Sequence, residues 1–244
     1  MSTTLLTAII LLTVASVVAA LFIVMWHEAT STRDKWVAAV AGAALAVWAS
    51  VAAVLAASGV LEQPETPATP PVGINLAVVL ALLTLTLAAS PRLRSLLSNQ
   101  KNLIRLNLWR LVGIVFLVLM NNHQMPALWA WPSGIGDIIV GAAAPWVANR
   151  FDSPGGRRRA TVLNLFGMAD LIVAVGLGMA TSPGPTQVFV TTPTSAFATH
   201  FPFALVPTFL VPLAFVLHVI SLWQIVGGTW ARRADGSRTD AVSR

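Results

Sequence analysis

WPSGIGDIIVGAAAPW (residues 131–146) contains a single ionisable residue, Asp137, in a stretch whose other residues all suit a membrane-spanning helix. The whole chain of 244 residues has a mean hydropathy of +0.77, and only 10% of its residues are charged. A soluble domain carries about 25% charged residues, so this chain has too few charges to cover a water-facing surface. The composition therefore predicts an all-α integral membrane protein with a carboxylate inside one of its helices.

Seven long apolar stretches predict a bundle of seven transmembrane helices, in one polytopic membrane domain that covers residues 1–244. The predicted spans lie at about 4–26, 36–58, 72–89, 103–120, 127–148, 161–181 and 203–226. The first span is expected to be a retained helix, because MSTT carries no basic residue and the apolar run is longer than that of a signal peptide.

The basic residues predict the orientation of this bundle. All of them except Arg110 lie on alternate connections or in the tail, and the opposite connections (59–71, 121–126 and 182–202) contain none. They are Arg33, Lys35, Arg92, Arg94, Lys101, Arg105, Arg150, Arg157, Arg158, Arg159, Arg232, Arg233, Arg238 and Arg244. The positive-inside rule then places the N-terminus outside and a basic tail, residues 227–244, in the cytoplasm. The preference for arginine over lysine, with abundant Ala and Val, indicates GC-rich coding and a bacterial inner membrane.

The positive charge itself is expected to face lipid. The segment 91–105 mixes basic residues with Leu and Ile, which predicts that it lies on the inner membrane surface and is attracted to anionic lipids. This accounts for the net charge of +6 without nucleic acid. Most tryptophans are predicted to mark the two membrane interfaces: Trp26, Trp36, Trp109, Trp146 and Trp230 inside, Trp129 and Trp131 outside. The Pro-rich stretch 61–71 is expected to form an extended outer loop.

A second aspartate lies in a similar sequence context in the next span. The stretches GIGDIIVGA (134–142) and GMADLIVAV (167–175) share the Gly and Asp spacing around Asp137 and Asp170. Because the two spans run antiparallel, this is a short local inverted repeat of the kind that places binding sites near the membrane midplane. Nothing similar occurs in the first three spans, so an inverted repeat of the whole chain is not predicted.

Two further ionisable residues, Arg110 and His218, lie inside predicted spans. A central charge costs about 2.5–3.5 kcal/mol on insertion scales, so these side chains are expected to face the bundle interior and each other. We expect Arg110 to pair with one aspartate and His218 with the other, with a proton shared among the acids and the histidine. A shallower Arg110 that extends toward the cytoplasmic interface is the alternative.

Several neighbours are predicted to support this cluster. Gly134 and Gly141 flank Asp137 on one helix face, where a neighbouring helix or a ligand approaches closely. Ser221 and Gln224 follow His218 at three-residue steps and form a polar stripe toward the cytoplasm, and Asn164 is a further polar candidate. Pro145, Pro207 and Pro212 are expected to interrupt their helices, and the uncharged outer connection 181–201 is long enough to act as a lid.

The sequence also excludes several kinds of site. It contains no cysteine, hence no disulfide and no thiolate metal site. It has no lysine inside a span for a retinal Schiff base, no metal-binding motif and no motif of hydrolases or nucleotide-binding enzymes, so neither a metal nor an enzymatic activity is predicted.

The leading functional prediction is proton-coupled transport of a small molecule or ion. Asp137 and Asp170 would bind substrate or proton, His218 would relay protons and Arg110 would balance charge. One alternative is a membrane protein that binds an apolar or redox cofactor, such as a quinone, a carotenoid or a haem held by His218. The other is a non-catalytic membrane subunit or sensor whose polar residues hold helices together. The sequence names no substrate, cofactor or oligomeric state.

Overall fold

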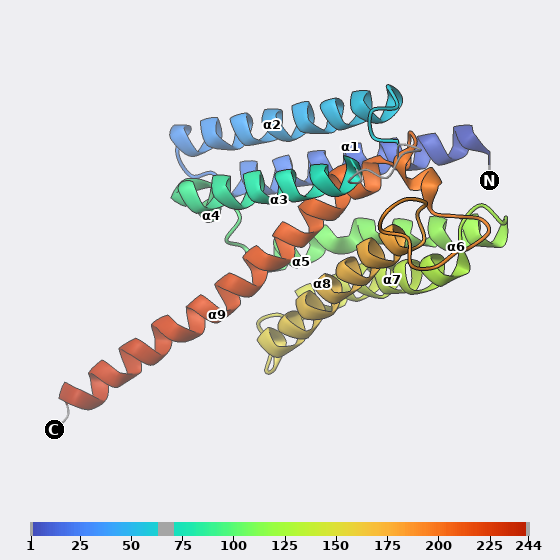
Figure 1. The fold of residues 1–244 in the computed structure, drawn as a ribbon. Coiled ribbons are helices and arrows are strands. Elements are labelled where there is room, and N and C mark those ends of the chain that lie inside the picture. The colour runs from blue at the N-terminus through green and yellow to red at the C-terminus, as the bar shows by residue number, and fades with distance from the viewer. Residues whose placement is uncertain (1, 63–70, 243–244) are drawn as a thin grey trace.

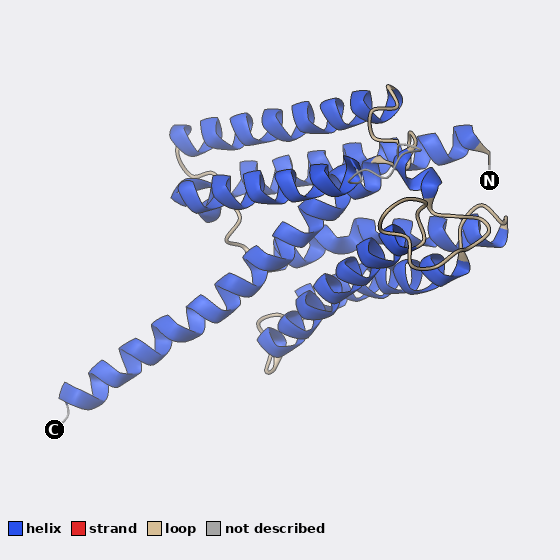
Figure 2. Cartoon of the chain, in the orientation of Figure 1, coloured by secondary structure: helices blue, strands red, loops and turns tan. Residues whose placement is uncertain are grey.

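The computed structural model describes residues 2–62 and 71–242 and contains only helices, turns and loops in these ranges (Figures 1 and 2). The first three long helices are α1 (Thr3–Glu28), α2 (Thr32–Ala57) and α3 (Pro71–Ala89). Two short helices follow, α4 (Pro91–Leu96) and α5 (Gln100–Arg105). α5 continues through the 3-10 helix η1 (Leu106–Gly113) into α6 (Ile114–Asn121). The chain then forms α7 (Ala127–Asn149), α8 (Gly156–Ala180), the short η2 (Ala196–Thr199) and η3 (Val206–Leu210), and α9 (Val211–Val242).

Six of the described helical segments are long and apolar enough to cross a membrane. They are Thr3–Glu28, Thr32–Ala57, Gln100–Asn121, Ala127–Asn149, Gly156–Ala180 and Val206–Gly227. A shorter apolar helix, Gly73–Ala89, occupies the position of the third predicted span. The last predicted span begins later than expected, because residues 201–204 form a turn that contains Pro202. The chain is thus a multi-pass, apolar helical bundle, as the composition predicts.

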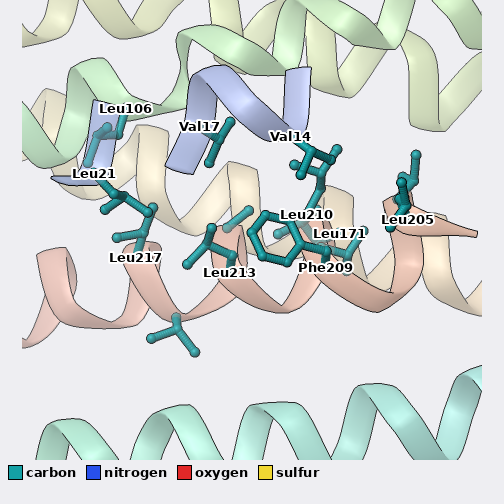
Figure 3. Close-up of a cluster of buried hydrophobic side chains, with 14 of the residues drawn as sticks. Val14, Val17, Leu21, Leu106, Leu171, Leu205, Phe209, Leu210, Leu213 and Leu217 are labelled. Atoms are coloured by element: carbon teal, nitrogen blue, oxygen red, sulfur yellow. The ribbon is translucent and has the colours of Figure 1, made fainter. Parts of the chain in front are cut away.

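The core of the bundle forms where α1 crosses α9 and its neighbours (Figure 3). Buried α1 residues recur at steps of three and four, which gives this helix one inward stripe: Ile10, Val14, Val17, Leu21 and Met25. Facing this stripe are Phe209, Leu213 and Leu217 of the last span. α9 thus lies among the other helices at its N-terminal end, while its C-terminal part extends past them toward the end of the chain (Figure 1).

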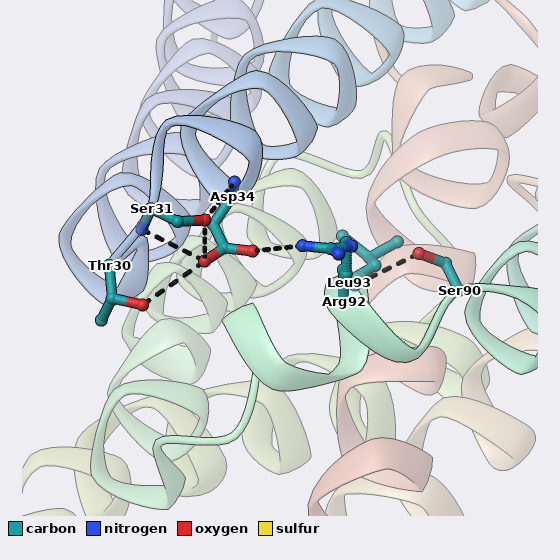
Figure 4. A network of polar contacts seen from close by, with 6 residues as sticks. All are labelled: Thr30, Ser31, Asp34, Ser90, Arg92 and Leu93. Atoms are coloured by element: carbon teal, nitrogen blue, oxygen red, sulfur yellow. Dashed lines mark hydrogen bonds and ion pairs between the residues drawn. The ribbon is translucent and has the colours of Figure 1, made fainter.

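Polar contacts at the end of the bundle fix the turn between α1 and α2 (Figure 4). Ser31 caps α2 by accepting a hydrogen bond from the Asp34 backbone N–H, and the Asp34 carboxylate accepts one from the Ser31 backbone N–H in return. The other carboxylate oxygen of Asp34 lies 3.3 Å from the Arg92 guanidinium of α4. This capping box satisfies N–H groups that the helix itself leaves free, and it joins α2 to α4.

The predicted interfacial segment 91–105 has a different structure from the one expected. It is divided between α4 and α5, and its apolar side chains are buried inside the protein instead of facing lipid: Leu96, Leu97, Leu103 and Ile104. The reason is that α1 and α9 pack against this segment and offer it an apolar partner.

Trp129 is likewise an interior residue, although an outer interface position was predicted. Only 6% of it is exposed, it packs among Phe116, Phe197 and Phe203, and its indole N–H donates to the Ala174 carbonyl at 2.8 Å. Trp26, Trp36, Trp131 and Trp146 are exposed, as interface residues would be. The greater part of the predicted outer loop, 63–70, lies outside the described residues, as do the side chains of the tail from residue 228 onward, including Trp230.

Candidate functional site

Arg110 lies at the centre of the site, on the one 3-10 segment inside a long span of the described structure. η1 packs more extensively against α7 than any other two described elements pack together. On η1, the buried Asn107 amide donates to the carbonyls of Leu103 and Ile104, both at 3.3 Å. A 3-10 stretch in the middle of a helix has poorer hydrogen-bond geometry than the α-helix around it and often marks a hinge. Arg110 is therefore carried by the least regular part of its helix.

The Arg110 guanidinium binds both aspartates at once. Its Nε donates to Asp137 Oδ1 at 2.6 Å, and its Nη2 donates to Asp170 Oδ2. These two carboxylates come from α7 and α8, so a single side chain of η1 connects three helices. The Arg110 side chain is fully buried, and the Asp137 and Asp170 side chains are 13% and 5% exposed. The guanidinium provides a fixed fork of donors that suits two carboxylates.

His218 of α9 completes the cluster as a neutral acceptor. Its Nε2 lies 3.0 Å from Arg110 Nη1, and its Nδ1 lies 2.8 Å from Asn164 Oδ1. A guanidinium has no acceptor, so Nε2 must accept and carries no proton. Nδ1 then carries the proton and donates to Asn164. The hydrogen bonds thus assign one tautomer to this fully buried ring.

The structure confirms that the four residues meet, but the pairing differs from the predicted one. His218 contacts neither aspartate, and Arg110 takes both. Arg110 also does not extend to the interface, because it is 0% exposed and also donates to the Gly167 carbonyl at 3.3 Å. The sequence-based interpretation treated Arg110 as the most peripheral of the four. The physical reason for the difference is that two buried carboxylates attract the guanidinium more strongly than the distant interface does.

Glycines let the helices approach at each member of the cluster. A Cβ on Gly113 would collide with the Asp137 side chain, and one on Gly136 would collide with the Asp170 carboxylate. A Cβ on Gly167 would lie 2.5 Å from His218 Nε2 and 2.9 Å from Arg110 Nη1. Small residues of this kind allow close helix contacts in membranes. The sequence analysis used Gly167 only as part of the repeat around Asp170, and it did not single out Gly113 or Gly136.

The two glycines that were predicted to support Asp137 allow close contact between α7 and the backbone of η1. A Cβ on Gly134 would lie 3.0 Å from the Gly113 carbonyl oxygen, and one on Gly141 would lie 2.7 Å from the Leu111 backbone nitrogen. Both therefore admit the backbone of η1 to α7. Of the two possibilities in the prediction, a close helix or a ligand, the structure shows the helix.

A continuous series of hydrogen bonds leads from His218 to the end of the bundle near α5. Asn164 Nδ2 donates to Ser221 Oγ at 2.8 Å, and Ser221 Oγ donates to Gln100 Oε1 at 2.8 Å. Gln100 Nε2 donates to Gln224 Oε1 at 2.7 Å, and Gln224 Nε2 donates to the Leu97 carbonyl at 2.8 Å. The predicted Asn164 and Ser221 thus join the cluster without an intermediary, and Gln224 joins it through Gln100, which the sequence analysis missed.

Two buried polar atoms beside the cluster lack a hydrogen-bond partner among the residues that the structure describes. Ser133 Oγ, one turn before Asp137 on α7, is unpaired, and so is Asn107 Oδ1, three residues before Arg110 on η1. Both residues are at most 2% exposed. Unpaired buried polar atoms are rare in folded proteins and mark places where strain, water or a ligand is expected. They lie on opposite sides of the cluster along its two helices, and neither was predicted.

The other histidines lie away from this site. His200, in the connection before η3, lies with its Nδ1 2.8 Å from Glu62, and His123 lies in the turn after α6. Among the described residues, no group of three or more His, Cys, Asp or Glu side chains could hold a metal ion.

Comparison with known proteins identifies the family. A family model described as a domain of unknown function (DUF8737) matches residues 69–226. The chain belongs to this family. The DUF8737 region contains Arg110, Asp137, Asp170 and His218 together with their supporting residues, whereas α1 and α2 precede it. No curated protein and no solved structure matches the chain.

Proposed function

We propose that the bundle crosses a bacterial inner membrane seven times as one domain, with its N-terminus outside and the tail from residue 227 in the cytoplasm. The distribution of basic residues supports this orientation. α3 has 19 residues, and a helix of that length is roughly 28 Å long, close to the thickness of the hydrocarbon core. Successive long helices also alternate in direction along the bundle (Figure 1).

The absence of cysteine makes this topology directly testable. Single-cysteine variants Val60→Cys, Ser98→Cys and Val190→Cys place a thiol before α3, after α4 and in the connection before η3, at exposed positions. With a membrane-impermeant maleimide on whole cells, we expect labelling at positions 60 and 190 and none at 98 until the cells are opened. If positions 60 and 98 are labelled from the same side, α3 does not cross.

Within this bundle, we propose proton-coupled transport of a small molecule or ion by the Arg110 cluster. The observation that carries the proposal is that one buried guanidinium binds two carboxylates while His218 stays neutral. With both aspartates ionised the cluster has one net negative charge, and one bound proton makes it neutral. Because an uncompensated charge is costly inside a membrane, the cluster is suited to bind and release a single proton.

Proton binding would change which helices Arg110 holds. Its Nε binds α7 through Asp137 and its Nη2 binds α8 through Asp170, so protonation of one carboxylate weakens one of the two connections. The 3-10 segment η1 is the element best placed to respond. This links protonation to a movement between helices, which is what coupled transport requires.

The role of His218 in this proposal differs from a relay. Both ring nitrogens are hydrogen-bonded to groups without an exchangeable acidic proton, Arg110 and the Asn164 amide. We propose that His218 positions the guanidinium between the aspartates. The unpaired Ser133 Oγ and Asn107 Oδ1 place a free polar atom on either side of the cluster, and these atoms support a route for the proton or the substrate.

Proton movement in reconstituted liposomes tests the assignment. Wild-type protein is expected to take up protons when a membrane potential is imposed, and Asp137→Asn and Asp170→Asn are expected to abolish uptake while still inserting. The exposed Asp152→Asn is the matched control. Infrared spectra should show the C=O band of a protonated carboxylic acid in the wild type and its loss in one of the two variants. Uptake by both variants at the wild-type rate would refute the assignment.

A second function, a non-catalytic subunit or sensor with the cluster as a helix clamp, is favoured by the same close contacts. Its signature would be loss of folding in both aspartate variants and no proton movement in the wild type. A cofactor protein is less well supported, because neither nitrogen of His218 is free to bind haem iron. A visible absorption band that weakens in His218→Ala would restore that alternative for a haem or a carotenoid.

A further inference from the structure

A groove runs between α7 and α8 on the surface of the bundle, and none of the four residues of the Arg110 cluster lines it. It has a volume of about 530 Å³ and begins near the loop that joins the two helices. Its walls combine two arginines with apolar side chains: Ile139, Ala143, Trp146, Val147, Gly155, Arg158, Arg159, Val162, Leu163 and Phe166. The groove is therefore charged at one end and apolar along the rest of its length.

At the charged end of the groove, two guanidinium groups lie over the indole ring of Trp146, and a third arginine, Arg158, lines the groove. The guanidinium groups of Arg150 and Arg159 lie 4.9 and 5.7 Å from the centre of the Trp146 ring. Arg159 is fixed by donating to the Arg150 carbonyl, to Ser153 Oγ and to the Pro154 carbonyl. Arg158 is exposed and forms no hydrogen bond or ion pair within the described residues. The one nearby carboxylate in this loop, Asp152, is paired with Lys101.

The apolar part of the groove is exposed on the surface of the bundle. Ile139, Val162 and Phe166 are 47%, 59% and 43% exposed, although their side chains are large and apolar. The helix from Arg158 to Phe166 rises roughly 12 Å, which is enough to lie along a large part of an acyl chain. A small anion in water would make no apolar contact with such a wall, and a neutral lipid would not pair with the charge of Arg158.

We infer that this groove binds an anionic phospholipid of the cytoplasmic leaflet, with the phosphate at Arg158 and one acyl chain along Ile139, Val162 and Phe166. The inference rests on the membrane placement proposed above, and it does not depend on proton transport. Clusters of basic side chains at the cytoplasmic interface attract anionic lipids, and Trp146 lies at the level where tryptophans contact headgroups.

The groove and the Arg110 cluster share helix α8. Phe166 lies one turn before Asp170 on α8, so the two side chains lie on the same side of that helix. A chain seated against Phe166 therefore packs beside the segment of α8 that carries Asp170. Occupation of the groove is expected to hold α7 and α8 together at this position.

Lipid titration of the detergent-purified, full-length protein tests the inference. Phosphatidylglycerol is expected to raise the thermal unfolding midpoint in a saturable way, and phosphatidylcholine with the same chains is expected to have little effect. Arg158→Gln should raise the phosphatidylglycerol concentration needed for half-saturation about fivefold, as expected for the loss of one interfacial charge. Arg33→Gln, which removes another exposed arginine far from the groove, is the matched control.

A second pair of variants tests the acyl chain separately from the charge. Ala143→Phe fills the groove and should weaken phosphatidylglycerol binding, whereas Ala142→Phe, at an exposed position outside the groove, should not. Equal stabilisation by phosphatidylcholine, or an unchanged response in both Arg158→Gln and Ala143→Phe, would overturn the inference. Stabilisation by inorganic phosphate at the same potency would show a simple anion site instead of a lipid site. None of these readouts involves proton movement, so the two proposals fail independently.

Discussion

The hairpin of α1 and α2 and the bundle of α5 to α9 both consist of helices long and apolar enough to span a membrane, yet the two regions are held together differently. Only 17% of the most apolar stretch of α2 is buried, against 67% of the span Val206–Gly227. α2 exposes most of its valines, and its ion pair lies at one end, at Asp34. The helices of the DUF8737 region instead meet at a buried ion cluster and at glycines. In lipid, apolar side chains contact the acyl chains as favourably as they contact another helix. Polar and small-residue contacts therefore specify how the helices pack.

The largest expected effect comes from removing the centre of the cluster. Arg110→Met leaves two buried carboxylates without a counter-charge and should lower the free energy of unfolding by about 3–5 kcal/mol. Unfolding of the purified protein in mixed detergent micelles, followed by tryptophan fluorescence, measures this change. Arg33→Gln is the control, since that arginine is exposed on the first turn of α2.

A triple variant separates the lost charge from the lost packing. Arg110→Met combined with Asp137→Asn and Asp170→Asn removes all three charges, and it should recover most of the stability that the single change loses. If the single variant is as stable as the wild type, the cluster does not hold the bundle together and the contrast between the two regions is wrong.

Glycine substitutions should have the next largest effect, and they test close approach instead of charge. Gly136→Ala inserts a methyl group against the Asp170 carboxylate and should cost about 1–3 kcal/mol. Gly176→Ala, on α8, meets nothing within 4 Å and should be neutral or slightly stabilising. The same unfolding assay compares them. Equal effects at the two positions would show that the helices move apart freely at Gly136.

The positions of the helices could be predicted from the sequence, but the contacts within the Arg110 cluster could be predicted only in part. The positions of the long helices follow from the lengths of the apolar runs, and the meeting of Asp137, Asp170 and His218 follows from the high cost of exposing them to lipid. The partner choice of Arg110 could not be predicted, because it depends on the rotation of three helices about their axes. Likewise, Gly136 differs from Gly176 only in what faces it, and Gln100 joins the hydrogen-bond series only because α5 packs against α9.

A smaller effect is expected from one tryptophan of each region, Trp129 of α7 and Trp48 of α2. The buried indole N–H of Trp129 donates to the Ala174 carbonyl. The indole N–H of Trp48 on α2 has no partner within residues 2–62 and 71–242, although its ring packs against Phe209 with 4.4 Å between the ring centres. Trp129→Phe should therefore cost about 1 kcal/mol more than Trp48→Phe, the net value of one hydrogen bond. Both substitutions remove similar ring area, so their difference isolates the hydrogen bond. Equal losses would indicate that this bond contributes nothing to the packing of α7 on α8.

The smallest effect is expected at the ion pair between the hairpin and α4. Arg92→Gln removes the contact to Asp34, but the capping box between Ser31 and Asp34 keeps the first turn of α2 intact. Because the pair is partly exposed, its contribution should disappear in about 1 M salt, where charges are screened beyond about 3 Å. The unfolding midpoint of Arg92→Gln should thus fall slightly at low salt and match the wild type at high salt. A large loss that persists in salt would mean that this polar contact fixes the hairpin to the rest of the protein. The two regions would then be held by the same kind of interaction, at the surface in one case and in the interior in the other.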